Sequence, residues 1–181
     1  MSAAARAVLA VLLLGAAAPD ARCAPDVGYE NAEQAFEGAI IASGIGQRGY
    51  DENREYAAAL YQMPNGRWYA TPVIAGGRTS SSIPYHLVPG QAVRIAGVHT
   101  HGQPRLPEDP SHIYGTDFSR ADRRNAMLAY QASHGRIDVQ LLLTSQLTVL
   151  RMSISPRYDP ATARIALAAD TARVDPPGTG P

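Results

Sequence analysis

The sequence contains very little cysteine, no lysine and no strongly basic stretch. Cys23 is the only cysteine in the chain, so an internal disulfide, a cysteine nucleophile and a thiolate metal site are all excluded. A metal ion would have to be bound by nitrogen and oxygen ligands. The 16 positive side chains are all arginine and are balanced by 16 acidic ones, so we expect no nucleic-acid partner.

The N-terminal residues have the pattern of a secretory signal peptide, which we place at residues 1–24. Arg6 supplies the positive start, and an apolar run from Ala7 to Ala18 follows it. That run is too short to cross a bilayer as a helix, which needs about 20 residues. A buried or membrane-lying helix is the alternative. We therefore expect a secreted or periplasmic protein without a stable membrane span, and lipidation at Cys23 is the weaker alternative because Asp20 and Arg22 precede it.

After the leader, the chain is long enough for one domain, which we place at residues 25–165, with a flexible tail at 166–181. The patterning predicts an α/β fold with a mixed, mostly antiparallel sheet flanked by helices. The first half is expected to form a helix over 31–43, ended by Gly44 and Gly46, and then a hairpin of 55–62 and 67–73 across an Asn65-Gly66 turn. A loop over 75–91, a strand over 93–102 and a loop over 102–118 follow. The chain then forms a helix from 119 to 135 and strands over 137–143 and 147–154.

The strand over 93–102 ends in two histidines, His99 and His101, followed by Gly102. Residues two apart on a strand share a face, so the two imidazoles point toward the same place. That arrangement suits two ligands of one metal ion. Two hydrogen-bonded polar side chains at a strand end are the alternative.

Two further acidic motifs flank the histidines. Ser119-x-x-Asp122 opens the second long helix, and Glu55 opens the first hairpin. Ser-x-x-Asp is also a capping-box pattern, in which both side chains only satisfy helix N-terminal amides, worth about 1 kcal/mol. Glu55 has its own alternative as a solvated strand residue.

Taken together, Glu, His-x-His and Ser-x-x-Asp resemble the motif of the JAB/MPN metallopeptidase superfamily, the JAMM proteases. The similarity extends, over about residues 50 to 135, to an uncharacterised bacterial branch of JAB-like domains found in secreted or toxin-associated proteins. The matching segments are Glu55-Tyr56-Ala57-Ala58, Tyr61, Asn65-Gly66, Tyr69-Ala70-Thr71-Pro72, His99-Thr100-His101-Gly102 and Phe118-Ser119-Arg120-Ala121-Asp122. Two features depart from the family: Ala57 and Ala58 stand where relatives usually have glycine, and the loop from His101 to Ser119 is longer than in the eukaryotic deubiquitinases.

The resemblance implies a cytidine-deaminase-like sandwich and one Zn²⁺ per chain, ligated by His99, His101 and Asp122. A catalytic zinc leaves its fourth position to water and lowers the pKa of that water toward about 7. The resemblance further implies that Glu55 accepts the water's proton and that Ser119 donates a hydrogen bond to the oxyanion. Glu52 competes with Glu55 for the role of base.

These assignments predict an exported zinc metallopeptidase that cleaves a peptide or isopeptide bond in a peptide or protein substrate, for example a cell-wall peptide. The alternative is a JAB-like scaffold without activity, serving as a binding, immunity or assembly protein. A two-metal phosphoesterase is disfavoured because the sequence has no second cluster of Asp and His. His86, His112 and His134 have no partner pattern, and we expect them at the surface or in loops.

Overall fold

The computed structural model describes residues 27–104, 115–161 and 164–174. The expected signal peptide at residues 1–24, Cys23, His112 and most of the loop over 102–118 lie outside these ranges. Within the described residues, no helix is both long enough and apolar enough to span a membrane.

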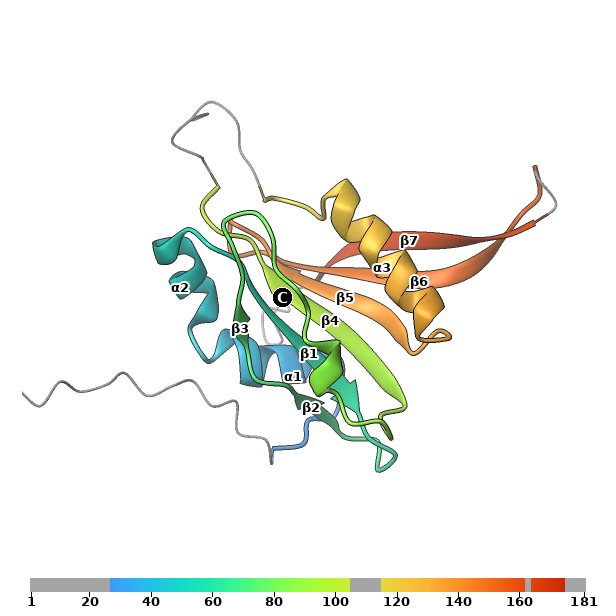
Figure 1. Ribbon diagram of the computed structural model, residues 1–181, viewed down its shortest axis with the longest axis horizontal. Coiled ribbons are helices and arrows are strands. Elements are labelled where there is room, and N and C mark those ends of the chain that lie inside the picture. The colour runs from blue at the N-terminus through green and yellow to red at the C-terminus, as the bar shows by residue number, and fades with distance from the viewer. Residues whose placement is uncertain (1–26, 105–114, 162–163, 175–181) are drawn as a thin grey trace, which may run out of the picture.

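The described residues form an α/β fold around one open seven-stranded sheet (Figure 1). The strand order is β2-β1-β4-β5-β6-β7. Strand β2 pairs with the C-terminal half of β1, and β3 pairs with its first two residues. The β4–β5 pair is parallel and the other pairs are antiparallel, which confirms the expected mostly antiparallel sheet. The strands are β1 (Tyr56–Gln62), β2 (Trp68–Ala70), β3 (Ile74–Ala75), β4 (Arg94–Thr100), β5 (Ile137–Leu143), β6 (Val149–Asp159) and β7 (Arg164–Val174).

The expected helix over 31–43 is present but is followed by a second one. Asn31 caps α1 (Ala32–Ala35) by accepting the Gln34 N–H, and the chain continues as the π-helical turns of η1 (Phe36–Ile41). Gly44 ends this run in the left-handed region at φ 72°, as predicted. The expectation that Gly46 also ends a helix was wrong, because Gly46 lies within the helix α2 (Ile45–Glu52), which begins directly after Gly44. This helix was not predicted, because glycine within a helix is unfavourable and α2 contains two glycines.

The Asn65-Gly66 hairpin is confirmed, with Gly66 at φ 80° and the Met63 N–H donating to the Arg67 carbonyl. Its second strand is divided into β2 and β3 at Thr71–Val73. Pro72 has no N–H to donate to a ladder, and the Thr71 hydroxyl accepts the Ala59 N–H at 2.9 Å in place of a carbonyl. The expected loop over 75–91 contains the short 3-10 helix η2 (Tyr85–Leu87).

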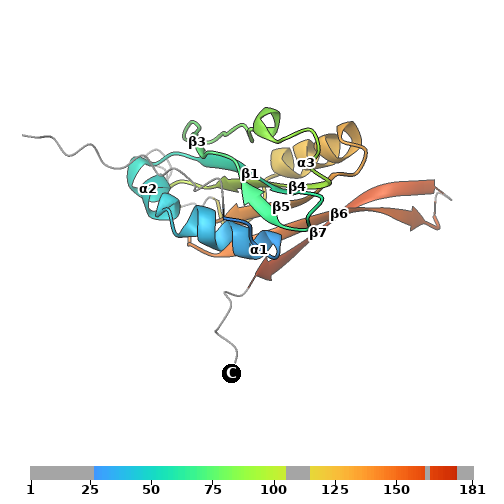
Figure 2. The same cartoon turned by 90° about the horizontal axis from the view of Figure 1, so that it is seen from below.

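The two faces of the sheet are covered by different helices (Figure 2). On one face, Phe36 and Ile40 pack in a core with Leu60, Val98 and Leu141. On the other, α3 (Arg120–Ala132) packs over β5, β6 and β7. Because side chains alternate along β4, the neighbour of inward-facing Val98 points to the α3 face, and that neighbour is His99.

The expectation of a flexible tail from residue 166 was wrong. Residues 164–174 form β7, which pairs with β6 from Val149↔Val174 to Asp159↔Arg164. The signal was missed because β7 is rich in alanine and mostly exposed, so hydrophobic alternation is weak. The β6–β7 hairpin extends beyond the rest of the sheet (Figure 1), and β6 tolerates Pro156 there because β5 pairs with β6 only as far as Ser153.

Gly97, at the centre of β4, provides a test of packing on the α3 face. A Cβ at this position would lie 2.1 Å from Gln140 Oε1 and 2.4 Å from the Tyr85 hydroxyl. We expect Gly97→Ala to lower the free energy of unfolding by about 1–3 kcal/mol, because overpacking displaces buried side chains. Gly90→Ala is the matched control, since no described atom beyond Gly90 and its two chain neighbours lies within 4 Å of its Cβ position. Equal denaturation midpoints for the two variants in urea would contradict this packing.

Candidate metal centre

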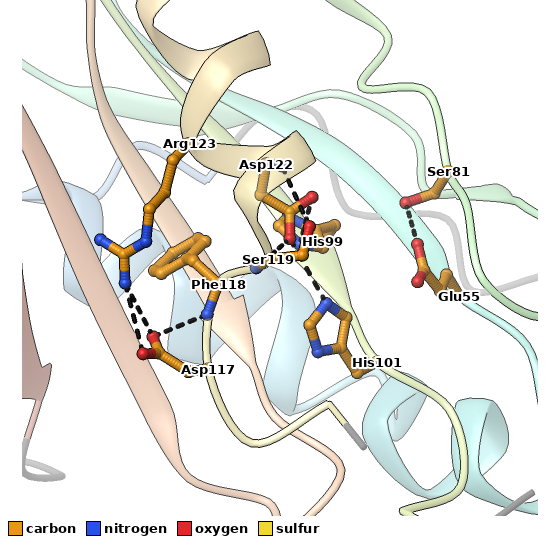
Figure 3. A network of polar contacts seen from close by, with 9 residues as sticks. All are labelled: Glu55, Ser81, His99, His101, Asp117, Phe118, Ser119, Asp122 and Arg123. Atoms are coloured by element: carbon orange, nitrogen blue, oxygen red, sulfur yellow. Dashed lines mark hydrogen bonds and ion pairs between the residues drawn. The ribbon is translucent and has the colours of Figure 1, made fainter.

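His99, His101 and Asp122 come together at the end of β4 and the start of α3 (Figure 3). One potential ligand atom from each residue lies within 4.8 Å of the other two. His99 Nε2 lies 3.6 Å from Asp122 Oδ1, and His101 Nε2 lies 3.8 Å from Asp122 Oδ2. The structure therefore gathers the three residues that the sequence pattern singled out.

The sheet positions both imidazoles. His99 lies on β4 between Ala57 of β1 and Leu142 of β5, and the Phe118 ring contacts its ring edge-on at a centroid distance of 5.8 Å. His101 follows the last residue of β4, and its N–H donates to the Leu143 carbonyl at 2.9 Å. Neighbouring strands thus hold the backbone of both histidines, which fixes the direction of their side chains.

The start of α3 positions the carboxylate. The Ser119 N–H donates to Asp122 Oδ2 at 2.7 Å, and the Asp122 N–H donates to Ser119 Oγ at 3.1 Å, which is a complete capping box. The capping-box interpretation of Ser119-x-x-Asp122 is therefore confirmed. It does not compete with the metal interpretation, because the same carboxylate that caps α3 also faces both imidazoles (Figure 3).

The protonation states favour a cation. Burial alone would raise the pKa of Asp122, but its interaction with His99 and the hydrogen bonds from Ser119 hold that pKa well below its usual range. Burial lowers the pKa of His101, and the neighbouring His99 lowers it further. An ionised carboxylate beside a neutral imidazole is the combination that metal binding requires.

Two unpaired nitrogen atoms provide an independent test of whether the group fits a metal. His99 Nε2 and His101 Nδ1 are buried and have no hydrogen-bond partner among the residues that the structure describes. Buried polar atoms in proteins are almost always paired, and an unpaired one needs a physical explanation. A cation held among the three side chains supplies that explanation for His99, because its unpaired Nε2 is the atom that faces Asp122. One imidazole nitrogen from each histidine and one carboxylate oxygen from Asp122 form a donor set that zinc accepts.

Glu55 lies in the same cavity and is only 8% exposed. Its backbone is held on both sides, since its N–H donates to the Gly77 carbonyl and its carbonyl accepts the Gly76 N–H. The Ser81 hydroxyl donates to Glu55 Oε2 at 3.0 Å (Figure 3). Burial raises the pKa of Glu55, and the Ser81 hydrogen bond partly opposes that rise.

Glu52, the competing carboxylate, has a different environment. It is exposed, accepts the Tyr56 hydroxyl at 2.6 Å and pairs with Arg48 at 2.8 Å. These contacts turn it away from the cavity, which it does not line. Of the two candidates, only Glu55 lines the cavity that contains His99, His101 and Asp122, which we call the metal group.

The cavity has a volume of about 490 Å³, within the range typical of ligand sites. Several of its lining residues were missed from the sequence, above all Ser81, Tyr85 and Gln140. A polar residue within the apolar run of β5 was the available signal for Gln140. No comparable signal distinguishes Ser81, because it lies between two other serines, Ser80 and Ser82, in the same loop.

The other residues of interest lie outside the cavity. Ala57, which stands where the JAB-like proteins that the sequence resembles usually have glycine, is buried and is not among the lining residues, so it does not narrow the approach to the metal group. His86 and His134 are exposed, as expected, in η2 and after α3. No protein-family model matches the chain, and no curated protein or solved structure matches it significantly. Any function must therefore be inferred from the side chains of the site.

The capping and ligating roles of Asp122 can be separated by mutation. We expect purified protein to retain about one Zn²⁺ per chain, and His99→Ala and Asp122→Ala to lose it, because a three-ligand site does not survive the loss of one ligand. Ser119→Ala is the control: it should lower stability by about 1 kcal/mol through the lost cap while keeping the metal. Metal content is measured by mass spectrometry after dialysis. Full zinc occupancy in Asp122→Ala would limit that residue to capping.

Proposed function

We propose that the protein is an exported, zinc-dependent metallopeptidase-like hydrolase of the JAB/MPN type that cleaves a peptide or isopeptide bond. The observation that carries this proposal is the placement of a buried carboxyl, Glu55, in the same cavity as a His99, His101 and Asp122 group. Three ligands with an additional base beside them are the arrangement of a catalytic zinc site rather than a structural one, which uses four protein ligands.

The reaction divides between the metal and the chain. When bound, zinc supplies Lewis acidity, which makes water acidic near neutral pH and polarises a carbonyl. Glu55 accepts the proton of the attacking water and returns it to the leaving amine. Its raised pKa suits both halves of that role, since a base near the working pH both takes and releases a proton.

Ser119 is the candidate donor to the oxyanion, and it lines the cavity. Its Oγ accepts the Asp122 N–H, and its hydroxyl also hydrogen-bonds to the Asp122 carboxylate. Stabilising an oxyanion would require the hydroxyl hydrogen to rotate from the carboxylate toward the substrate. A donor of this kind typically contributes on the order of 100-fold or more to kcat.

The substrate is a peptide or protein encountered outside the cytoplasm, for example a cell-wall peptide. A second candidate function, a metal-holding binding, immunity or assembly protein without turnover, is favoured by one observation. The capping box gives Asp122 and Ser119 a structural reason to be present without any reaction. The two functions differ in whether Glu55 matters for turnover.

Glu55→Gln tests the proposed reaction. We expect this variant to retain zinc and folding but to lose about 100-fold or more of its peptidase activity, because an amide cannot accept the proton. Activity is followed by mass spectrometry of a proteome-derived peptide library and of peptidoglycan digests. Glu52→Gln is the matched control and should keep full activity, since Glu52 lies outside the cavity. Identical cleavage by wild type and Glu55→Gln would remove Glu55 from the mechanism.

Ser81→Ala tests how Glu55 is held. Loss of the Ser81 hydrogen bond removes an interaction that lowers the Glu55 pKa, so that pKa should rise further. Because the base works only when deprotonated, the acid limb of the kcat/KM profile should move to higher pH while zinc content stays unchanged. Ser82→Ala, on the same segment, should leave the profile in place. An unmoved acid limb in Ser81→Ala would show that this hydrogen bond does not tune the base.

A further inference from the structure

The cavity continues away from the metal group into a region that the proposed reaction does not use. We call this region the side pocket and define it by six residues that line the cavity beyond the ligands. They come from η2 and the segment before it, from α3, and from the sheet: Ile83, Tyr85, Ala126, Ala129, Gln140 and Met152. Figure 2 shows that α3 and the segment containing η2 lie on the same face of the sheet, opposite α1.

One wall of the side pocket is a stripe of small residues on α3. Asp122, Ala126 and Ala129 are spaced by four and three residues, so they share one face of the helix. All three line the cavity, whereas Leu128 on another face is 52% exposed. The stripe that begins with the candidate ligand Asp122 therefore continues as two alanines, of which Ala126 packs in one buried cluster with Met152 of the sheet while Ala129 is half-buried.

The opposite wall and the far end are formed by a hydrogen-bonded pair. Gln140 Nε2 donates to the Tyr85 hydroxyl at 3.0 Å. The pair lies directly against Gly97, where a Cβ would meet both side chains. Burial raises the pKa of Tyr85 to about 12, so the phenol stays neutral. The far end thus offers polar atoms but no charge.

The charged residues that line the cavity are not part of the side pocket. His99, His101 and Asp122 form the metal group, and Glu55 and Arg78 line the same cavity, with Arg78 next in the chain to Gly77, which pairs with the Glu55 backbone. None of the six side-pocket residues carries a charge. A charged group placed among them would lose its hydration without gaining an ionic partner, which is strongly unfavourable.

We propose that the side pocket is the specificity pocket of the site and that it accepts a neutral, mainly apolar side chain of the substrate residue next to the scissile bond. This inference rests on the proposed function, because it takes the metal group as the place where the bond is cleaved. It adds a substrate class: peptides with an aliphatic or aromatic residue, rather than an acidic or basic one, at that position.

Binding of small hydroxamates to the zinc-loaded full chain tests the inference without requiring turnover. Acetohydroxamate reports on the metal alone, and analogues with an isobutyl or a carboxymethyl group report on the side pocket. Affinities are measured by isothermal titration calorimetry. The isobutyl analogue should bind about tenfold or more tighter than acetohydroxamate, as expected for burial of a leucine-sized group. The carboxymethyl analogue should gain nothing.

Two variants of α3 test whether the isobutyl group binds in the side pocket. Ala129→Leu fills the side pocket and should remove the advantage of the isobutyl analogue while leaving acetohydroxamate affinity within about twofold, a difference smaller than 1 kcal/mol. Leu128→Phe adds bulk to the exposed side of the same helix and should preserve the wild-type order. Thermal unfolding checks that each variant is folded. The comparison of the three hydroxamates on the wild-type protein tests the inference even if a variant fails to fold.

The outcomes separate the two proposals. If acetohydroxamate binds but the isobutyl analogue binds no tighter, or the carboxymethyl analogue binds best, the specificity pocket is refuted and the proposed function stands. An isobutyl advantage that survives in Ala129→Leu also refutes it, because the side chain then lies elsewhere. If zinc-loaded protein does not bind acetohydroxamate at all, the site has no open metal position, and both proposals fail together.

Discussion

The approach of one carboxylate to two imidazoles is the interaction on which the site depends. Asp122 reaches His99 and His101 because α3 connects the parallel strands β4 and β5 and begins near the end of β4. A parallel pair requires such a crossover, and here the crossover brings the helix start to the histidines. The capping box then holds the first turn of α3, so that the contact that stabilises the helix also aims the carboxylate.

The two faces of the sheet have different tasks. The face covered by α1 and η1 carries the larger and more continuous core, with Phe36, Ile40 and Leu141 fully buried. The α3 face contains the cavity, and α3 contributes the small residues Ala126 and Ala129 to its wall. Stability and chemistry therefore come from alternate residues of the same strands, and a slip of one residue in register would exchange them.

Local sequence patterns predicted the site residues that are only two or three positions apart in the chain. Two histidines two apart on a strand, and a Ser-x-x-Asp at a helix start, determine side-chain direction by geometry alone. Residues that reach the site through tertiary packing were harder to find. Ser81 enters the cavity only because the segment before η2 folds across the sheet, and nothing in its own neighbourhood in the sequence records that contact. For Gln140 the only local signal is a polar residue within the apolar run of β5. The choice of Glu55 over Glu52 came from the family resemblance, and the structure supplies its physical basis in burial and hydrogen bonding. The helix α2 and strand β7 were missed because glycine and alanine give weak local signals even where long-range pairing is complete.

X-ray absorption at the zinc edge of the purified protein tests the central claim most directly. The account predicts a four-coordinate zinc with scattering from two imidazole rings and with nitrogen and oxygen atoms bound directly to the metal at about 2.0–2.2 Å. One imidazole contribution should disappear in His101→Ala. A spectrum without imidazole scattering, or one that His101→Ala leaves unchanged, would show that β4 and α3 do not form a metal centre.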